Sequence, residues 1–245
     1  MGSTRTRRLK SSVAVAAVLL FSQGAYGAHP LVTEDTGTQG KGGWQLELNG
    51  ERNRDEGVRG AQAEVKLAYG IADTLDVALA APWLDTGAES GMGDAAIEIK
   101  WRFWERGPLS LALQPGLTLP SARDGQGLGT GRTTWGALLI GSYQGEDWLF
   151  QAHAGYRRNR NTLGERESIR QVAGAVLYKL TDSVLPLLDV SLTTNPDPAS
   201  GKAVRETVLG VIWQVTKDFD LDAGIRIGND PAIDRALMLG ATIRW

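Results

Sequence analysis

The chain ends on "ALMLGATIRW" at residues 236–245, and apolar and polar residues alternate up to the last position. One parity holds Leu237, Leu239, Ala241, Ile243 and Trp245. Strict alternation is typical of a β-strand with one apolar and one polar face. Chain ends usually fray. A patterned strand that closes on a large aromatic side chain therefore indicates that the end has a fixed place in the fold.

The same period of two recurs along the chain, for example in "GAQAEVKLAY" at 60–69 and "FDLDAGIRIG" at 219–228. Most segments with this pattern are longer than the five or six residues usual for soluble strands, and about nine to eleven residues suit a tilted transmembrane strand. We predict about twelve strands, near 44–53, 58–69, 75–84, 93–104, 109–119, 133–144, 148–158, 168–180, 184–194, 203–215, 219–228 and 235–245. Pro115 predicts a bulge in the fifth strand or an earlier end to it.

The loops between these strands alternate in length. "GIADT", "ERGP", "QGED", "TDS" and "TKD" are tight turns, whereas "DTGAESGMG", "SARDGQGLGTG", "NRNTLGERE" and "NPDPASGK" are long and polar. Short turns at one rim and long loops at the other are typical of outer-membrane barrels. The sequence predicts an all-β fold: a transmembrane, antiparallel, up-and-down β-barrel over residues 44–245, with short periplasmic turns and longer extracellular loops.

The N-terminus has the features of a secretory signal. Four basic residues precede the apolar run "SSVAVAAVLLF", and small residues follow it near Gly27. The run is too short to cross a bilayer as a helix, so a cleaved signal over 1–27 is favoured over a membrane anchor. Removing it leaves 22 basic and 28 acidic residues, a formal charge of −6, from the 26 and 28 of the whole chain. An acidic, exported chain argues against nucleic acid as a partner.

Aromatic residues mark the two ends of the strands. Nine of them lie at the short-turn ends, each on the apolar parity of its strand: Trp44, Tyr69, Trp101, Phe103, Tyr143, Trp148, Tyr178, Trp213 and Trp245. Trp83, Trp135 and Tyr156 lie near the opposite rim. A general preference of aromatic residues for strands does not predict one rim and one parity. We therefore interpret the nine as an interfacial aromatic girdle on the lipid-facing surface.

The position of Trp245 follows from this arrangement. With an even number of strands, the chain ends at the periplasmic rim, where an aromatic side chain belongs. Outer-membrane barrels as a class end on an aromatic residue within the last strand, which the barrel assembly machinery reads. Leu239, Ala241, Ile243 and Trp245 match that signal, and anchoring of Trp245 in the interface is compatible with it.

Several longer segments resemble one family. They are "HPLVTEDTGTQGKGGWQLELNGE" at 29–51, "GMGDAAIEIKWRFWE" at 91–105, "GLTLP" at 116–120, "GLGTGRTTWG" at 127–136, "GYRRNRNTLGER" at 155–166 and the ending from Asn229. In this order they are similar to the outer-membrane transporters of the MetA-pathway phenol-degradation family. The resemblance implies a barrel that passes hydrophobic or aromatic compounds, with outer-membrane lipid and a small hydrophobic solute as partners.

The polar parity should line the lumen. It carries Glu47, Glu64, Lys66, Asp76, Glu98, Lys100, Arg102, His153, Arg157, Asp189, Asp222, Arg226 and Arg244. Twelve tilted strands give a backbone radius of roughly 12 Å, so inward side chains narrow or close the passage. Mixed charges either pair across strands or line a weakly selective water path, and pairing is favoured because neither sign dominates. The segment 28–43 forms either a loose periplasmic tail, the favoured alternative, or a plug in the lumen.

Neither catalysis nor a cofactor is indicated. After the signal only His29 and His153 remain, and there is no cysteine, so a typical zinc site cannot form. If the turn at 144–147 pairs Tyr143 with Trp148, then His153 lies roughly 13 Å from Ser142, too far for a nucleophile and its base. The glycine-rich loops precede no helix and do not read as phosphate-binding loops.

Two functional classes remain open. The first is a passive channel for small hydrophobic or aromatic molecules, with loops 85–92, 120–132 and 159–167 capturing the solute. The second is a structural or adhesive barrel that transports nothing, although loops of about ten residues are short for that role. A soluble periplasmic β-sandwich is less favoured, because it would not need an aromatic girdle at one rim.

Overall fold

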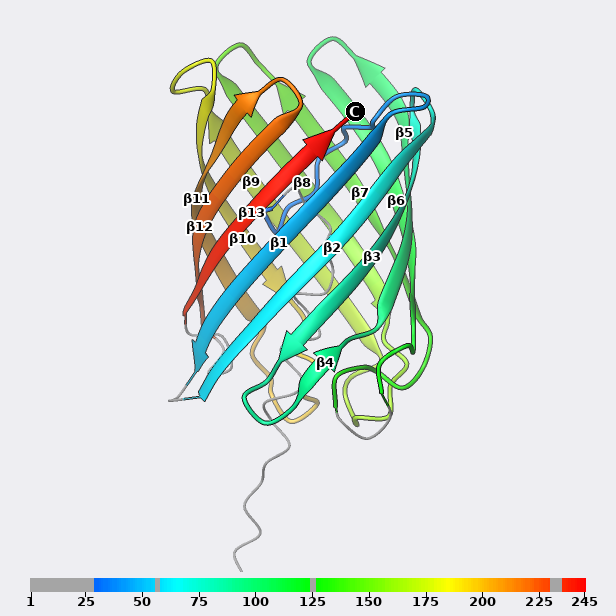
Figure 1. Cartoon of the computed structure of the whole chain (residues 1–245). Coiled ribbons are helices and arrows are strands. Elements are labelled where there is room, and N and C mark those ends of the chain that lie inside the picture. Colours follow the sequence, from blue (N-terminus) through cyan, green and yellow to red (C-terminus); the bar gives the residue numbers. More distant parts are fainter. Residues whose placement is uncertain (1–28, 56–57, 124–126, 230–234) are drawn as a thin grey trace, which may run out of the picture.

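The computed structural model describes residues 29–55, 58–123, 127–229 and 235–245. Its strands form an antiparallel sheet that closes on itself (Figure 1). The strands are β1 (Trp44–Asp55), β2 (Val58–Ala72), β3 (Leu75–Asp85), β4 (Ser90–Met92), β5 (Ala95–Arg106), β6 (Leu109–Leu119), β7 (Thr134–Gln144), β8 (Trp148–Arg158), β9 (Ser168–Tyr178), β10 (Val184–Thr193), β11 (Val204–Thr216), β12 (Phe219–Gly228) and β13 (Arg235–Arg244). None of the described residues forms a helix long and apolar enough to cross a membrane.

The barrel closes through its last strand. β13 pairs with β1 from Gln45 opposite Arg244 to Arg54 opposite Arg235, and it pairs with β12 on its other side. The backbones of Trp44 and Trp245 also exchange hydrogen bonds at the rim. The C-terminal strand is therefore held on both sides, which explains why its alternation persists to the end of the chain.

Alternation sets the two surfaces of the barrel. In β13, Leu237 and Leu239 are exposed on the outside, while Ala236 and Met238 are buried inside. The same inside-and-outside pattern appears in β3 and β12. Because successive side chains point to opposite faces, each strand supplies both a lipid-facing row and a lumen-facing row.

The strand predicted near 93–104 is β5 in the structure, and a separate short strand, β4, precedes it within the segment predicted as a long loop. β4 and β5 both pair with β3, but their registers differ by one residue, since Trp83 faces Met92 whereas Ala80 faces Ala96. Gly93 and Asp94 lie between the two strands, and the Gly93 N–H donates to the Pro82 carbonyl at 2.9 Å. Twelve strands close the barrel, and the three residues of β4 extend the β3 ladder into the long-loop rim.

The expectation of a bulge or an early end at Pro115 is wrong. β6 runs on to Leu119, and β7 pairs with it through Pro115 without a shift. Proline has no backbone N–H to donate, and this affects only the side towards β5, where no ladder pair joins β5 to Pro115. The irregularity between β5 and β6 lies instead beside Phe103, between Arg102 and Trp104.

Candidate functional site

The most informative part of the lumen is occupied by the chain's own N-terminal segment. Residues 29–39, which we call the lumenal segment, lie inside the barrel and continue through a turn into β1 (Figure 1). Leu31, Thr33, Glu34 and Thr36 are buried, with exposed fractions of 8%, 0%, 1% and 4%. A loose tail would leave these side chains in water, so that alternative, which the sequence favoured, is wrong.

The segment begins against glycines of the inner wall. The His29 Nδ1 lies 2.5 Å from the Asp222 carboxylate, and Pro30 lies over β11 and β12. A Cβ added to Gly210 would come within 2.8 Å of the Pro30 ring, and one added to Gly224 within 3.0 Å. Gly210 and Gly224 are opposite each other in the ladder. Because neither glycine has a side chain, Pro30 can approach the backbone of the inner wall closely at this place.

The next residues meet an apolar part of the wall. Leu31 packs in a cluster of inward side chains made of Ala175, Leu177, Leu185, Leu187, Val208 and Met238. We call this cluster the apolar wall; it spans β9, β10, β11 and β13. Asp189, on the same side, accepts hydrogen bonds from the backbone N–H groups of Val32 at 2.9 Å and Thr33 at 2.7 Å. Burial of Leu31, together with the hydrogen bonds from the Val32 and Thr33 N–H groups to Asp189, fixes this part of the segment.

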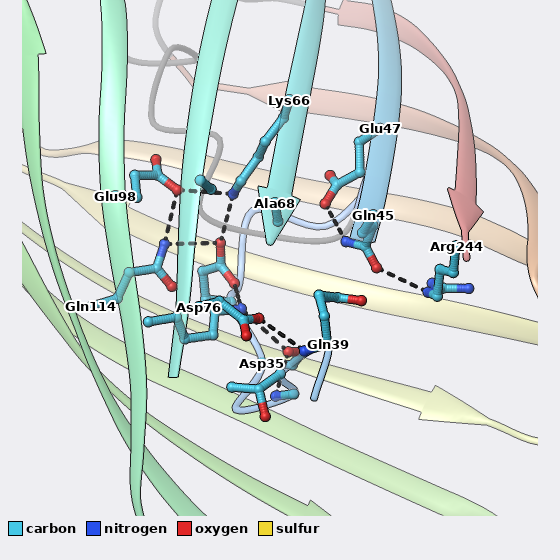
Figure 2. A pocket seen from close by; sticks show the side chains of 15 residues that line it. Asp35, Gln39, Gln45, Glu47, Lys66, Ala68, Asp76, Glu98, Gln114 and Arg244 are labelled. Atoms are coloured by element: carbon cyan, nitrogen blue, oxygen red, sulfur yellow. Dashed lines mark hydrogen bonds and ion pairs between the residues drawn. The ribbon is translucent and has the colours of Figure 1, made fainter. Parts of the chain in front are cut away.

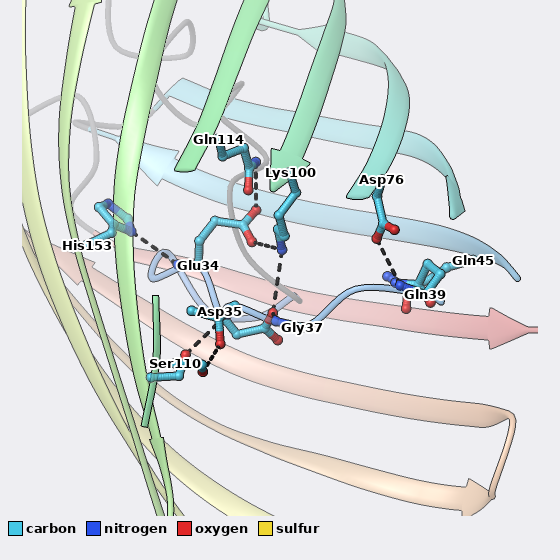
Figure 3. A network of polar contacts seen from close by, with 12 residues as sticks. Glu34, Asp35, Gly37, Gln39, Gln45, Asp76, Lys100, Ser110, Gln114 and His153 are labelled. Atoms are coloured by element: carbon cyan, nitrogen blue, oxygen red, sulfur yellow. Dashed lines mark hydrogen bonds and ion pairs between the residues drawn. The ribbon is translucent and has the colours of Figure 1, made fainter. Parts of the chain in front are cut away.

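Glu34 reaches the opposite side of the lumen (Figure 3). Its carboxylate lies 2.6 Å from the Lys100 Nζ and 3.6 Å from the Lys66 Nζ. The Gln114 amide donates to it at 3.3 Å, and Glu98 completes the group at 2.9 Å from Lys66. We call these five residues the polar network. Each charged side chain of the network has an opposite charge beside it, and this attraction offsets the free-energy cost of removing the charges from water.

The segment leaves the lumen through further polar contacts. The Thr36 hydroxyl lies 2.5 Å from the Ser110 hydroxyl, and the Gln39 N–H donates to Asp76 at 2.9 Å. Partial burial of the Asp35 carboxyl opposes its ionisation, but Lys100 and the Gly37 N–H outweigh that effect, so the pKa of Asp35 lies below its ordinary value. The segment thus contacts strands on several sides of the barrel and crosses the passage instead of lying along one wall.

A cavity of about 330 Å³ remains beside the segment, towards the short-turn rim (Figure 2). Its lining is mainly polar and includes Glu47, Asp76, Lys100 and Arg244. Gln45 links two of its sides, because it donates to Glu47 at 2.6 Å and accepts from Arg244 at 2.9 Å. This space is large enough for several water molecules or a small polar solute.

The inward residues predicted from parity lie as follows. Buried inside the barrel are Glu47, Glu64, Lys66, Asp76, Glu98, His153, Asp189, Asp222 and Arg226, and half-buried are Lys100, Arg102, Arg157 and Arg244. The structure brings Lys66, Glu98 and Lys100 together around Glu34, whereas Arg226 and Asp189 lie elsewhere in the lumen. Arg102 is at the rim, 3.1 Å from Glu105.

Sequence reasoning missed several partners of these charges. Arg226 pairs with Glu51, and its other nitrogen lies 3.4 Å from Glu206. Arg244 pairs with Asp220 at 2.8 Å. The parity of β1, β11 and β12 could have identified all three carboxylates. Glu34 could not be found that way, because the lumenal segment has no strand pattern.

The register between β7 and β8 differs from the one inferred for the histidine argument. Tyr143 faces Phe150, so His153 lies opposite Ile140 and Ser142 lies opposite Gln151. The His153 Nδ1 accepts the Glu34 N–H at 3.1 Å, and the Ser142 hydroxyl accepts the Thr36 N–H at 3.1 Å. Both side chains hold the lumenal segment. Among the described residues, no group of three or more potential ligands is arranged to bind a metal ion.

At the other end of the lumen, the long loops contact one another. Asp94 accepts the Thr130 N–H at 2.7 Å, which ties loop 120–132 to the start of β5. The Thr162 N–H donates to the Thr130 carbonyl at 2.9 Å, and the Arg166 N–H donates to the Pro196 carbonyl at 2.8 Å. Each of these long loops is therefore joined to its neighbour along the rim.

The outer surface has an aromatic rim at its short-turn end. Trp44 stacks beside Trp245 with ring centroids 6.3 Å apart and lies 4.6 Å from Tyr69. Trp148 and Tyr178 make a second contact at 4.6 Å. Exposed apolar side chains such as Leu209 and Leu237, both at 55%, cover the surface above this rim. An aromatic rim beside a band of exposed apolar side chains is the pattern expected of a barrel surface in contact with lipid.

A closed antiparallel barrel with a lipid-facing apolar band and an aromatic rim is an outer-membrane β-barrel, and the cell outer membrane is its location. The chain belongs to the family described as "Putative MetA-pathway of phenol degradation", whose model matches residues 25–245.

Solved structures agree on the fold. A KdgM porin in complex with disordered oligogalacturonate is similar at a TM-score of 0.63 and 7% identity, covering 81% of this chain and 98% of the porin. An outer-membrane channel from Pseudomonas putida F1 is similar at a TM-score of 0.63 and 14% identity, covering 91% and 98%. At such identities the likeness shows the shared fold. No curated protein matches the chain.

Proposed function

We propose that this protein is an outer-membrane channel for small hydrophobic, in particular aromatic, molecules, which cross by passive diffusion. The observation that carries the proposal is the lumenal segment, which contacts both the polar network and the apolar wall. A segment fixed at so many points excludes large hydrophilic solutes and leaves room only for small ones.

The family and the lumen together support the class of solute. The family description refers to phenol degradation, and Leu31 packs with Leu177, Leu187 and Val208, an apolar surface that a solute would meet when the lumenal segment moves aside. Hydrophobic surface on both the solute and the wall favours contact between them. The cavity beside Glu47 and Asp76 is polar and offers such a molecule little, so passage follows the apolar wall.

The proposal includes no catalytic step. His153 accepts a backbone N–H from Glu34, and His29 contacts Asp222, so both histidines act in holding the segment. His153 lies opposite Ile140, so it is not placed beside the Ser142 hydroxyl as a general base would be.

An engineered disulfide tests whether the segment closes the channel. The Thr36 and Ser110 hydroxyl oxygens are 2.5 Å apart, and the chain contains no cysteine of its own. The pair Thr36→Cys and Ser110→Cys should therefore form one bond that locks the segment. We expect uptake of toluene and phenol by cells carrying the oxidised variant to fall several-fold and to recover on reduction.

The single variant Ser110→Cys is the matched control and should be insensitive to reduction. Planar-bilayer recordings of the purified barrel add a second readout, because low ion conductance is expected for the wild type. Unchanged uptake in the locked variant, together with large and steady wild-type conductance, would replace this proposal with a general porin. Unchanged uptake with no conductance would favour a structural or adhesive barrel.

A further inference from the structure

The lipid-facing surface carries a set of arginines at its long-loop end. They are Arg52 on β1, Arg158 on β8, Arg170 on β9, Arg205 on β11 and Arg235 on β13. Each shares the outward parity of its strand, and all are exposed except Arg158, which is half-buried. We call these five residues the arginine arc, because β8 to β13 and β1 are consecutive neighbours in the barrel.

Each strand that carries one of the five arginines also carries an aromatic residue of the girdle on the same face. The pairs are Trp44 with Arg52, Trp148 with Arg158, Tyr178 with Arg170, Trp213 with Arg205 and Trp245 with Arg235. Eight or ten residues separate the members of a pair, which at about 3.3 Å per residue and a tilt of about 40° is roughly 20–25 Å along the barrel axis. That distance matches the apolar band of an outer-membrane barrel, about 25 Å tall. The arginines therefore lie at the headgroup level of one leaflet when the aromatic residues lie at the other.

The residues next to the arginines belong to the apolar band. Val172 is 51% exposed two positions from Arg170, and Leu237 is 55% exposed two positions from Arg235. Arg158 pairs with Glu167, but the other four arginines form no ion pair with any described residue. Four guanidinium groups thus lie at the edge of a low-dielectric surface without an ion-pair partner among the described carboxylates.

The opposite side of the barrel differs. At the long-loop ends of β3, β6 and β7 the outward residues include Trp83, Leu119 and Trp135, at exposed fractions of 40%, 38% and 50%. Among the side chains that the structure describes, the arginines on the lipid-facing parity of a strand at this rim therefore lie within one arc. Within the arc, Arg170, Arg205 and Arg235 occupy alternate strands, about 10 Å apart at the usual strand spacing.

We propose that the arginine arc binds the phosphate groups of lipopolysaccharide, the phosphorylated glycolipid of the outer leaflet. A guanidinium presents a fork of N–H donors that matches phosphate oxygens and is weakly hydrated, so it suits a membrane interface. The lipid A part of lipopolysaccharide carries a phosphate at each end of a disaccharide, and these can meet arginines on different strands. Its acyl chains then cover the apolar band below the arc.

Binding of defined lipids to the purified barrel tests the assignment. The probes are bis-phosphorylated lipid A, dephosphorylated lipid A and inorganic phosphate, each measured in detergent with EDTA so that no divalent cation bridges the phosphates. The variant changes Arg52, Arg170, Arg205 and Arg235 to Gln. We expect it to bind bis-phosphorylated lipid A at least about tenfold more weakly than the wild type, with binding of dephosphorylated lipid A unchanged.

Arg106→Gln is the matched control, since Arg106 is an exposed arginine at the short-turn end of β5. It should leave lipid A affinity unchanged. Retained fast mobility on an unheated gel shows that each variant is folded, and the double variant of Arg170 and Arg205 should give an intermediate loss. Equal affinity in the fourfold variant, an equal loss with Arg106→Gln, or capture of inorganic phosphate with no preference for the lipid would overturn the proposal.

Discussion

The two sides of the lumen come from strands of similar length and alternation, yet they differ in chemistry. On one side, β2 and β5 turn Lys66, Glu98 and Lys100 inward, and these charges pair around Glu34. On the other side, β10 and β11 turn Leu187 and Val208 inward, and they pack around Leu31. The lumenal segment uses both: Leu31 supplies apolar contact and Glu34, three residues on, supplies charge. Alternation therefore fixes which residues face inward but leaves the chemistry of each inner wall independent.

The largest effect is expected from placing a charge on the apolar wall. Leu187 is 5% exposed and lies opposite Leu177 and Gly210, so Leu187→Asp would bury a carboxylate with no opposite charge across the ladder, at a cost of about 4 kcal/mol. The temperature at which the fast gel mobility of the folded barrel is lost measures this effect. Ala80→Asp is the control, because Ala80 lies opposite Lys66 in the ladder between β2 and β3, and it should cost much less. If both variants lowered this temperature equally, the two inner walls would not differ in their tolerance of a buried carboxylate.

Breaking the polar network should cost somewhat less. Lys66→Met removes the cation 2.9 Å from Glu98 and leaves that carboxylate buried, which we expect to destabilise the barrel by about 3 kcal/mol. Adding Glu98→Gln should recover part of the loss, because it removes the unpaired charge. Chemical unfolding of the refolded barrel in lipid vesicles gives both values. A double variant less stable than the single one would contradict the ion-pair account.

Displacing the segment should cost the barrel little but change its permeability. A side chain at Gly224 would meet Pro30, since even a Cβ there comes within 3.0 Å of that ring. Gly224→Leu should therefore raise ion conductance several-fold while lowering barrel stability by only about 1 kcal/mol. Gly174→Leu is the control, because the atom nearest to a Cβ at Gly174 is 3.7 Å away. If conductance did not rise, the fit of Pro30 against the glycines would not hold the channel closed.

The smallest effect concerns pH and Asp35. Its pKa lies below the ordinary value of 3.8, so its contribution is present above that pH and is lost as the pH falls through the lowered folded-state pKa. Wild-type conductance should therefore rise slightly under strongly acidic conditions, below about pH 4. Asp35→Asn should show the raised level already at neutral pH, and a pH dependence identical to that of the wild type would exclude Asp35 as the cause.

Some features could be predicted from particular residues. The alternation at Ile97, Glu98 and Ile99 gave both the strand and the inward direction of Glu98, because neighbouring side chains in a strand must point to opposite faces. The details of pairing were less accessible. The tight turn after Tyr143 did not reveal that Phe150 is its partner, since two-residue shifts preserve which face each side chain occupies.

The placement of Glu34 shows a further limit. It lies in a segment without periodicity, and its three partners come from β2, β5 and β6. The inward glycines Gly210 and Gly224 were a signal for a close approach, but their meaning depends on knowing that they are opposite each other.

The class of fold, the lipid-facing row of each strand and the strand that closes the barrel could be inferred from the amino-acid sequence, since these follow from a local period of two and from turn lengths. What fills the lumen depends on the folded barrel. Residues 29–39 enter it because closure brings Asp189, Lys100 and Ser110 within reach of a chain that has no regular structure of its own. The energy of that placement comes from contacts between residues distant in sequence, which no local pattern encodes.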